Sequence, residues 1–100
     1  MESTRQKKIS RQLQKDLSDI FQLEGRALFG TCFVSVTMVR VSPDLSVSRV
    51  YLSFFGVENK DELLAQINQT SYAIRKKLAA RVRNQMRKVP ELKFFLDDSV

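Results

Sequence analysis

The sequence predicts an α+β domain in which three helices cover one face of a three-stranded sheet. Apolar residues recur at helical spacing in one segment near the start and in two segments after residue 60, and β-branched residues alternate on both sides of residue 43. A short apolar segment after Pro90 completes the order helix, strand, strand, helix, helix, strand. One hundred residues make about one domain, so we expect a single unit at residues 1–100 with a mobile tail at residues 97–100.

The first helix is predicted at residues 5–22. Its apolar residues follow one another at steps of four, four, three and one, which places them on one helical face. They are Ile9, Leu13, Leu17, Ile20 and Phe21. Ser3 or Thr4 has a side chain suited to capping the first turn. Gly25 and Gly30 are expected to bracket a short loop that leads to the first strand.

Two strands and a tight turn are predicted to form an antiparallel hairpin. Residues 31–41 and 47–55 are rich in β-branched and apolar side chains that alternate along the chain. The apolar phase of the first strand shifts by one residue near Met38, which indicates a β-bulge. Residues 42–45 have turn chemistry, because Pro43 presets its own φ and Asp44 can bond to nearby backbone.

A second helix is predicted to begin near Lys60, with Asn59 or Asp61 as its cap. The polar run at residues 68–71 has a weaker helix preference and predicts a kink before the third helix. The candidate residues for this kink, and for stacking on RNA beside it, are Thr70, Ser71 and Tyr72. Two roles stay open for Tyr72, which either stacks on an unpaired base or fastens the two helices together.

The third helix is expected to continue to about Lys88. Pro90 then stops it, because proline disfavours a helical residue before it. A short final strand is predicted at residues 92–96, where apolar residues include two phenylalanines. For the strand phenylalanines as a group we expect core packing rather than base stacking; they are Phe33, Phe54, Phe55, Phe94 and Phe95.

The segment at residues 70–90 carries seven cations and no acidic residue, whereas the whole chain has a net charge of only +6. The seven are Arg75, Lys76, Lys77, Arg81, Arg83, Arg87 and Lys88. On a helix these cations lie away from the apolar stripe that begins at Ile67 and Ile74. Like charges four residues apart repel each other, so an ordinary solvated face would mix signs. The segment therefore predicts a polyanionic partner, with structured RNA as the first hypothesis.

The first helix carries a second basic group, which is Arg5, Lys7, Lys8, Arg11 and Lys15. Taken alone, this group is equally well explained by surface solubility. If the first helix packs beside the third, the two groups would form one continuous positive field and would both contact RNA.

Other functional classes have few residues to support them. The chain has no histidine, only one cysteine, and no run of about 20 apolar residues that could span a membrane. We therefore expect no catalytic residue, no cofactor, no metal site and no small-molecule substrate. A protein- or membrane-binding module that uses a basic amphipathic helix is an alternative, but the core needs the apolar stripe of that helix. Cys32 is expected to be a small buried side chain in a reducing, cytoplasmic setting.

Three motifs resemble the bacterial ribosome-binding factor A family. The hairpin reads VSPDLS and then RVYLS at residues 41–46 and 49–53, and the opening helix reads IS and LQKDLS at residues 9–10 and 13–18. The closing segment reads IR, VR, VPELKF and DDS at residues 74–75, 82–83, 89–94 and 97–99. The resemblance implies a type II KH-like fold with a mixed sheet. It also implies a non-enzymatic, cytoplasmic and monomeric factor that binds the free small ribosomal subunit.

The resemblance further implies that such a factor promotes late maturation and processing of ribosomal RNA and supports growth in the cold. One departure concerns the kink, where the family commonly carries Ala-x-Gly and this chain has Thr70, Ser71 and Tyr72. Glycine lets backbone approach a nucleotide chain closely. We therefore expect contact through the cationic face rather than a KH-style clamp, and a general KH-like RNA-binding module remains an alternative.

Overall fold

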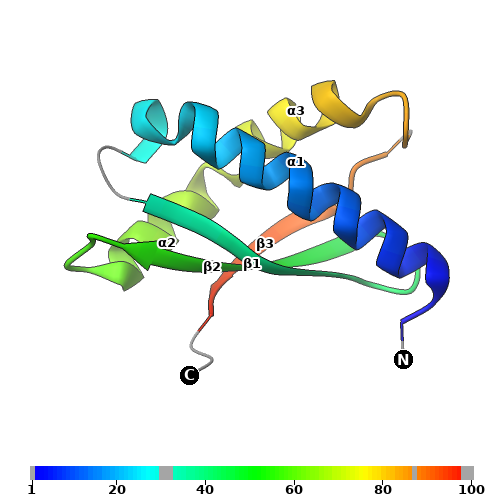
Figure 1. The fold of residues 1–100 in the computed structure, drawn as a ribbon, viewed down its shortest axis with the longest axis horizontal. Helices are drawn as coiled ribbons and strands as arrows, with labels where there is room; N and C mark the ends of the chain where they lie inside the picture. The colour runs from blue at the N-terminus through cyan, green and yellow to red at the C-terminus, as the bar shows by residue number, and fades with distance from the viewer. Residues whose placement is uncertain (1, 30–32, 87, 98–100) are drawn as a thin grey trace.

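The computed structural model describes residues 2–29, 33–86 and 88–97 and has the predicted order of elements (Figure 1). In chain order these are α1 (Thr4–Phe29), β1 (Phe33–Val41), β2 (Val47–Phe55), α2 (Lys60–Gln69), α3 (Ser71–Val82) and β3 (Glu91–Leu96). The α+β class is thereby confirmed. The loop residue Gly30, the predicted start of the first strand at residue 31 and the expected core residue Cys32 lie outside the described residues.

The three strands form one mixed sheet in the order β1-β2-β3. β1 and β2 pair antiparallel as the predicted hairpin, and β2 and β3 pair parallel. A parallel pair needs a long crossover connection, which α2 and α3 provide. The predicted bulge is confirmed, because the register shifts between Val36 and Met38 and leaves Thr37 without an opposite residue.

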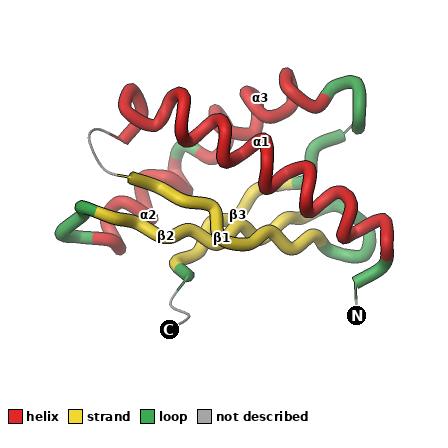
Figure 2. Tube along the Cα trace, in the orientation of Figure 1, coloured by secondary structure: helices red, strands yellow, loops and turns green. Residues whose placement is uncertain are grey.

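One face of the sheet is covered and the other is open. α1 and α3 lie over the covered face, and α2 packs beside β3 (Figures 1 and 2). Every helix and strand contributes to one hydrophobic core, in which Leu13, Leu52, Ile67, Ile74 and Leu78 are fully buried. Successive strand residues point to opposite faces, so the alternate residues of all three strands remain on the open face.

The hairpin turn has the predicted chemistry. The Asp44 carboxylate accepts hydrogen bonds from the Ser42 hydroxyl at 2.7 Å, the Ser46 hydroxyl at 2.7 Å and the Ser46 backbone N–H at 3.1 Å. These bonds, the one from Ser42 above all, lower the pKa of Asp44 from 3.8 to about 2. Leu45 completes the turn with a φ of 62°.

α1 begins with a predicted cap but extends further than predicted. The Gln6 N–H donates to Ser3 Oγ at 3.1 Å and the Ser3 N–H donates to Gln6 Oε1 at 2.7 Å, which is a capping box. The loop expected after Gln22 is wrong, because α1 continues through Gly25 to Phe29. One glycine costs a helix only about 1 kcal/mol relative to alanine, which does not end a helix that is packed on β1.

The predicted kink is confirmed at Thr70, where α2 ends and α3 begins. Asn59 caps α2 by accepting a backbone hydrogen bond at 3.0 Å. The Thr70 hydroxyl lies within hydrogen-bond distance of the Gln66 and Ile67 carbonyls, at 3.2 and 3.1 Å. The Thr70 carbonyl then accepts from the N–H of Ile74 in the first turn of α3. Because φ of Thr70 is −99°, the kink does not need a glycine.

The prediction that the third helix continues to about Lys88 is wrong, because α3 ends at Val82. The chain turns there, and two of the N–H groups that follow donate to the Val82 carbonyl at 2.8 and 2.9 Å. It turns early because Val89 must enter the core and β3 must start beside β2. Arg83 and Lys88 therefore lie in the segment that connects α3 to β3, and Arg87 lies outside the described residues.

The first residue of the expected tail is bonded to the sheet. The Asp97 N–H donates to the Leu52 carbonyl at 2.8 Å, and the Thr37 hydroxyl donates to the Asp97 carboxylate. Residues 98–100 lie outside the described residues.

Candidate nucleic-acid interface

A row of cations follows the outer face of α1. Lys7, Arg11 and Lys15 are exposed, and their spacing of four residues separates them by about 6 Å along the helix axis. They border a hollow of about 590 Å³ whose described lining residues are Thr4, Lys7, Lys8, Arg11, Gln12 and Lys15. None of these residues is acidic. This part of α1 therefore offers only positive charge and neutral donors to a ligand.

A groove of about 650 Å³ joins α1 to the segment after α3. Arg5 and Lys8 line it from α1 and Lys88 lines it from that segment, with apolar side chains such as Ile9 between them in the lining. Its one acidic lining residue among those described, Asp44, is already hydrogen-bonded in the hairpin turn. Two cations of the first basic group and one of the second thus line the same groove, and a continuous field that contacts RNA stays a prediction.

Arg81 links α3 to α1. Its guanidinium donates to Asp16 Oδ1 at 3.2 Å and to Asp19 Oδ2 at 2.9 Å, and both carboxylates belong to α1. The Asp16 side chain is only 10% exposed, so Arg81 neutralises a carboxylate that water hardly reaches. Arg81 was predicted to contact RNA, and the structure gives its guanidinium this interhelical contact.

Arg75 is also bonded within the domain. Its Nε and Nη2 atoms donate to the Val89 carbonyl at 3.2 and 2.6 Å, which ties α3 to the residue that precedes Pro90. An RNA role for Arg75 stays a prediction, and its contact with Val89 fixes the path of the connecting segment.

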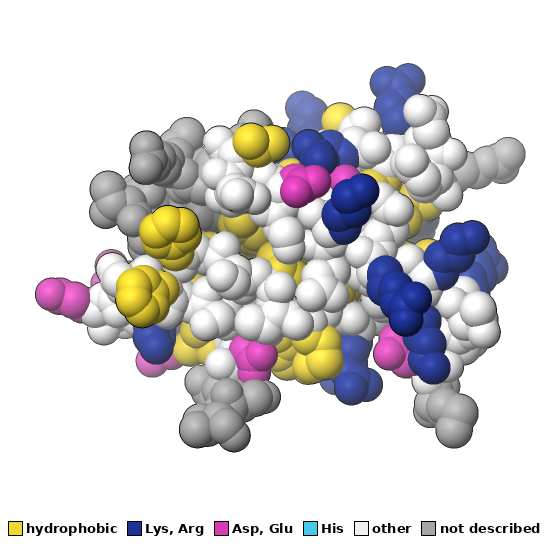
Figure 3. Space-filling model, in the orientation of Figure 1, with side chains coloured by type: hydrophobic (Ala, Val, Ile, Leu, Met, Phe, Trp, Pro, Cys, Tyr) yellow, Lys and Arg dark blue, Asp and Glu magenta, His cyan; other side chains and the backbone are white. Residues whose placement is uncertain are grey.

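The remaining predicted cations of this region differ in their surroundings. Lys76, Arg83 and Lys88 are exposed, and none of them forms an ion pair with a described residue. Lys77 is half-buried, and Arg87 lies outside the described residues. We define the helical basic surface as the exposed cations of α1, α3 and the connecting segment that form no ion pair with a described residue: Arg5, Lys7, Lys8, Arg11, Lys15, Lys76, Arg83 and Lys88. Figure 3 shows Lys and Arg side chains gathered over α1 and α3.

At the kink, the three predicted residues have different roles in the structure. Thr70 uses its hydroxyl on the backbone of α2, and Ser71 is half-buried. Tyr72 is 78% exposed, so it does not fasten the two helices together. Its ring is accessible, and stacking on a base stays a prediction.

The open face of the sheet carries aromatic residues for which the sequence predicts core packing. Phe33 and Phe55 are 73% and 78% exposed, so the expectation of core packing is wrong for both and for the partly exposed Phe95. It is confirmed for Phe54 and Phe94, which are buried. Alternation along the strands separates these two sets, and register decides which set faces the helices.

Three cations on the open face were also missed, namely Arg40, Arg49 and Lys93. Arg40 is paired with Arg49, and Arg49 with Lys93. The hairpin register could have brought Arg40 and Arg49 together from the sequence, because both lie just outside the turn. Lys93 joins them only through the parallel pairing of β3.

Two kinds of site are not found in the described part of the chain. No group of three or more acidic, histidine or cysteine side chains that could share a metal ion occurs among residues 2–29, 33–86 and 88–97. Nor does any described helix combine the length and the apolar character needed to cross a membrane.

Comparison with known proteins identifies the family. A family model described as ribosome-binding factor A matches residues 5–100. The ribosome-binding factor A of Cytophaga hutchinsonii is 48% identical over 100 residues, which cover all of this chain and 75% of that protein. The factor of Flavobacterium psychrophilum is also 48% identical, over 101 residues that cover all of this chain and 78% of that protein.

Solved structures agree in fold. The crystal structure of ribosome-binding factor A from Thermus thermophilus has a TM-score of 0.73 and 30% identity, covering 91% of this chain and 94% of that one. A homology model of the Thermus thermophilus factor, fitted into the map of its complex with the 30S subunit, has a TM-score of 0.68 and 33% identity, covering 86% and 88%. The type II KH-like fold is thereby confirmed. With its family model, its close relatives and its fold in agreement, this chain belongs to the ribosome-binding factor A family.

Proposed function

We propose that this chain is an assembly factor that binds the small ribosomal subunit by placing its helical basic surface on phosphates of the ribosomal RNA. The observation that carries the proposal is the hollow on α1, where Lys7, Arg11 and Lys15 stand in a row without an acidic neighbour in the described lining. Such a row repels itself along the helix, and an RNA backbone would relieve that repulsion.

The identity of the target is supported by the relatives. A factor with the same fold has been fitted into the map of a complex with the 30S subunit, and the family is named for ribosome binding. We extend to this chain the preference for free small subunits, the promotion of late maturation and processing of ribosomal RNA, and the support of growth in the cold. It would act in the cytoplasm as a monomer and without catalysis.

The mode of contact follows from the kink. Thr70 has a β-branched side chain where a KH-style clamp would need glycine. Its φ of −99° is a backbone conformation that does not require glycine. Charge on exposed lysines and arginines is then the main source of affinity. The logarithm of the affinity should fall with the logarithm of salt concentration by about 0.7 to 0.9 for each phosphate contacted.

The two alternative functions have less support. A module that inserts the apolar side of a basic helix into a partner needs that side to be free, but Ile74, Leu78 and Val82 of α3 are fully buried in the core. A general KH-like RNA-binding module would need the close backbone approach that the kink lacks. Neither is favoured by a specific observation.

The test is to follow the chain through a sedimentation gradient of cell lysate and to compare two matched charge reversals. Arg11→Glu changes the helical basic surface, whereas Lys60→Glu makes the same change of charge at the exposed first residue of α2. We expect the wild-type chain and Lys60→Glu to sediment with free small subunits and Arg11→Glu to remain near the top. Equal sedimentation of both variants would contradict the role of α1, and absence of wild-type chain from the small subunit would contradict the target.

A further inference from the structure

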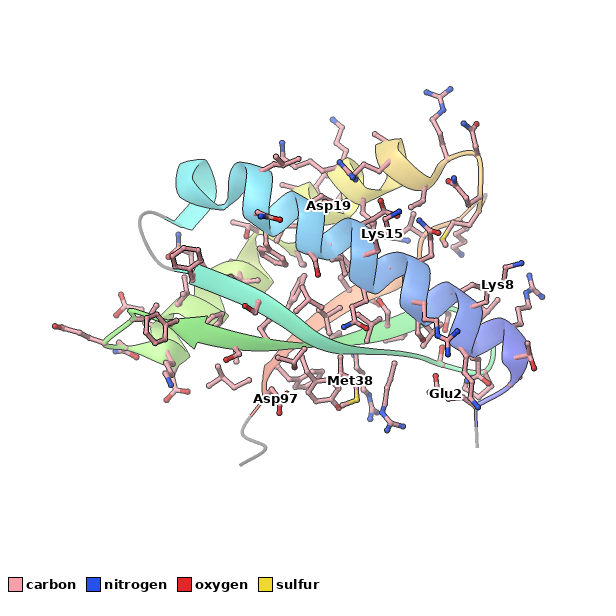
Figure 4. The ribbon with its side chains drawn as sticks, viewed as in Figure 1. Glu2, Lys8, Lys15, Asp19, Met38 and Asp97 are labelled. Atoms are coloured by element: carbon pink, nitrogen blue, oxygen red, sulfur yellow. The ribbon has the colours of Figure 1, made fainter. Side chains whose placement is uncertain are left out.

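A second cationic site lies on the open face of the sheet, away from the helical basic surface. A hollow of about 780 Å³ is bordered there by residues of all three strands and the hairpin turn: Arg40, Val41, Ser42, Pro43, Val47, Arg49, Tyr51, Lys93 and Phe95. Its described lining contains three cations and two aromatic rings but no carboxylate. Figure 4 shows Met38, which pairs with Tyr51, on the side of the sheet opposite to Lys8 and Lys15 of α1.

The three cations form one transverse row across the sheet. Arg40, Arg49 and Lys93 are register partners on adjacent strands, and adjacent strands lie about 4.8 Å apart. Like charges placed directly opposite each other destabilise a sheet. None of the three forms an ion pair with a described residue, including Glu91 at the start of β3 on the same face. This repulsion would be relieved by an anionic ligand.

The next row along the same face is aromatic. Tyr51 pairs with Phe95, and their ring centroids are 5.7 Å apart with an interplanar angle of 30°. Because residues two apart on a strand share a face, Tyr51 follows Arg49 and Phe95 follows Lys93. Phe95 keeps 39% of its surface exposed. Charge and exposed ring therefore occur side by side within one hollow.

We infer that this hollow binds a short single-stranded segment of RNA, with phosphates on the row of three cations and a base against the Tyr51–Phe95 pair. Proteins that bind single strands combine a cationic track with aromatic rings on which bases stack. A duplex would satisfy the cations but would keep its bases away from the rings. An acidic peptide would satisfy the cations as well but would leave the rings unused.

This inference extends the proposed function to a second face of the domain and does not need the helical basic surface to bind. The two faces together would let the factor hold structured RNA on its helices and an unpaired strand on its sheet. A failure of either site can be recognised separately, because each has its own residues and its own RNA probe.

The test uses the full chain with a fluorescent decauridylate, a fluorescent RNA hairpin of the same length and polyglutamate as probes. Tyr51→Leu and Phe95→Leu keep an apolar side chain, and we expect each to weaken decauridylate binding by at least about fivefold. Arg40→Gln/Arg49→Gln/Lys93→Gln should lower the salt slope for decauridylate by about 2, which corresponds to three phosphates at about 0.7 each. Lys60→Gln, at an exposed residue of α2 that belongs to neither surface, should leave decauridylate affinity within about twofold.

Several results would overturn the inference. They are absence of decauridylate binding to the wild-type chain, equal loss of decauridylate and hairpin binding in Tyr51→Leu, or displacement of decauridylate by polyglutamate at equal charge concentration. Amide chemical-shift changes on adding decauridylate provide a readout that does not depend on a variant. They should concentrate in residues 38–53 and 91–97, and a concentration in α1 instead would also overturn the inference.

Discussion

Neutralising the cation row of α1 should weaken RNA binding and at the same time make the fold more stable. In the variant Lys7→Gln/Arg11→Gln/Lys15→Gln, all three changed residues are exposed, and they border the hollow that has no described acidic lining residue. Loss of three phosphate contacts should lower the salt slope for small-subunit binding by about 2.1 to 2.7. When salt rises from about 50 to about 200 mM, the ratio of wild-type affinity to variant affinity should therefore fall by about 20- to 40-fold.

The stability gain has an independent origin. Lys7/Arg11 and Arg11/Lys15 are two like-charge pairs at a spacing of four residues, and each costs about 0.2 to 0.5 kcal/mol. Removing both should stabilise the fold by about 0.4 to 1 kcal/mol, which raises the melting temperature by about 2 to 6 °C for a domain of this size. Lys7 also lies in the first turns of α1, where the helix dipole disfavours a cation.

Two assays check this prediction, namely filter binding to small subunits across a salt series and thermal unfolding at low salt. A structural role for the row would give the opposite sign in the second assay, with a lower melting temperature. Equal salt slopes for the variant and the wild-type chain would show that these residues do not contact phosphates. Either result would refute the argument that the row is kept for binding rather than for the fold.

Three further predictions concern contacts inside the domain. Arg81→Gln should cost about 1 to 2 kcal/mol in urea unfolding, between the values for exposed and buried pairs, because it leaves the Asp16 carboxylate with a hydrogen bond from Gln12 but without its ion pair. Adding Asp16→Asn should recover most of that loss, and no recovery would refute the pairing. Asn68→Asp should cost about 1 kcal/mol of unfolding free energy, because the Asn68 side-chain amide donates to the Phe94 carbonyl at 3.1 Å and accepts from the Phe94 backbone N–H at 3.0 Å. An equally stable variant would mean that water replaces this contact. The pKa of Asp44 is lowered to about 2, so the ionised carboxylate stabilises the fold above pH 3.8, and this effect is lost as the pH falls through about 2. The difference in unfolding free energy between the wild-type chain and Asp44→Asn should therefore fade over that window. A difference that grows as the pH falls would contradict the sign.

Local pattern was sufficient for most of the fold. The bulge at Thr37 appears in the sequence as a shift of apolar phase, and the kink at Thr70 appears as a polar run between two helical patterns. Both features depend on residues within a few positions of each other. The end of α3 at Val82 is different, because it depends on where β3 must begin and on the burial of Val89. The residues around Val82 do not by themselves indicate where β3 begins.

The candidate sites divide in the same way. The cations of α1 were found from the sequence, because helical spacing places Lys7, Arg11 and Lys15 on one face. The contact of Arg81 with Asp16 was not found, because it joins residues that are far apart in the chain and meet only when α1 packs on α3. Arg81, which a helical wheel places among the exposed cations, therefore also stabilises the fold through an ion pair.

By itself the sequence determined the order of elements, the antiparallel hairpin and the excess of positive charge, since these follow from side-chain periodicity and composition. Only the tertiary structure decided which cations stay unpaired and which strand face stays open. Those properties arise from contacts between distant segments. Arg81 forms ion pairs with two carboxylates of α1, and Lys93 lies beside Arg49 only because β3 pairs parallel with β2. Charge could be counted along the chain, but its availability to a partner depends on packing.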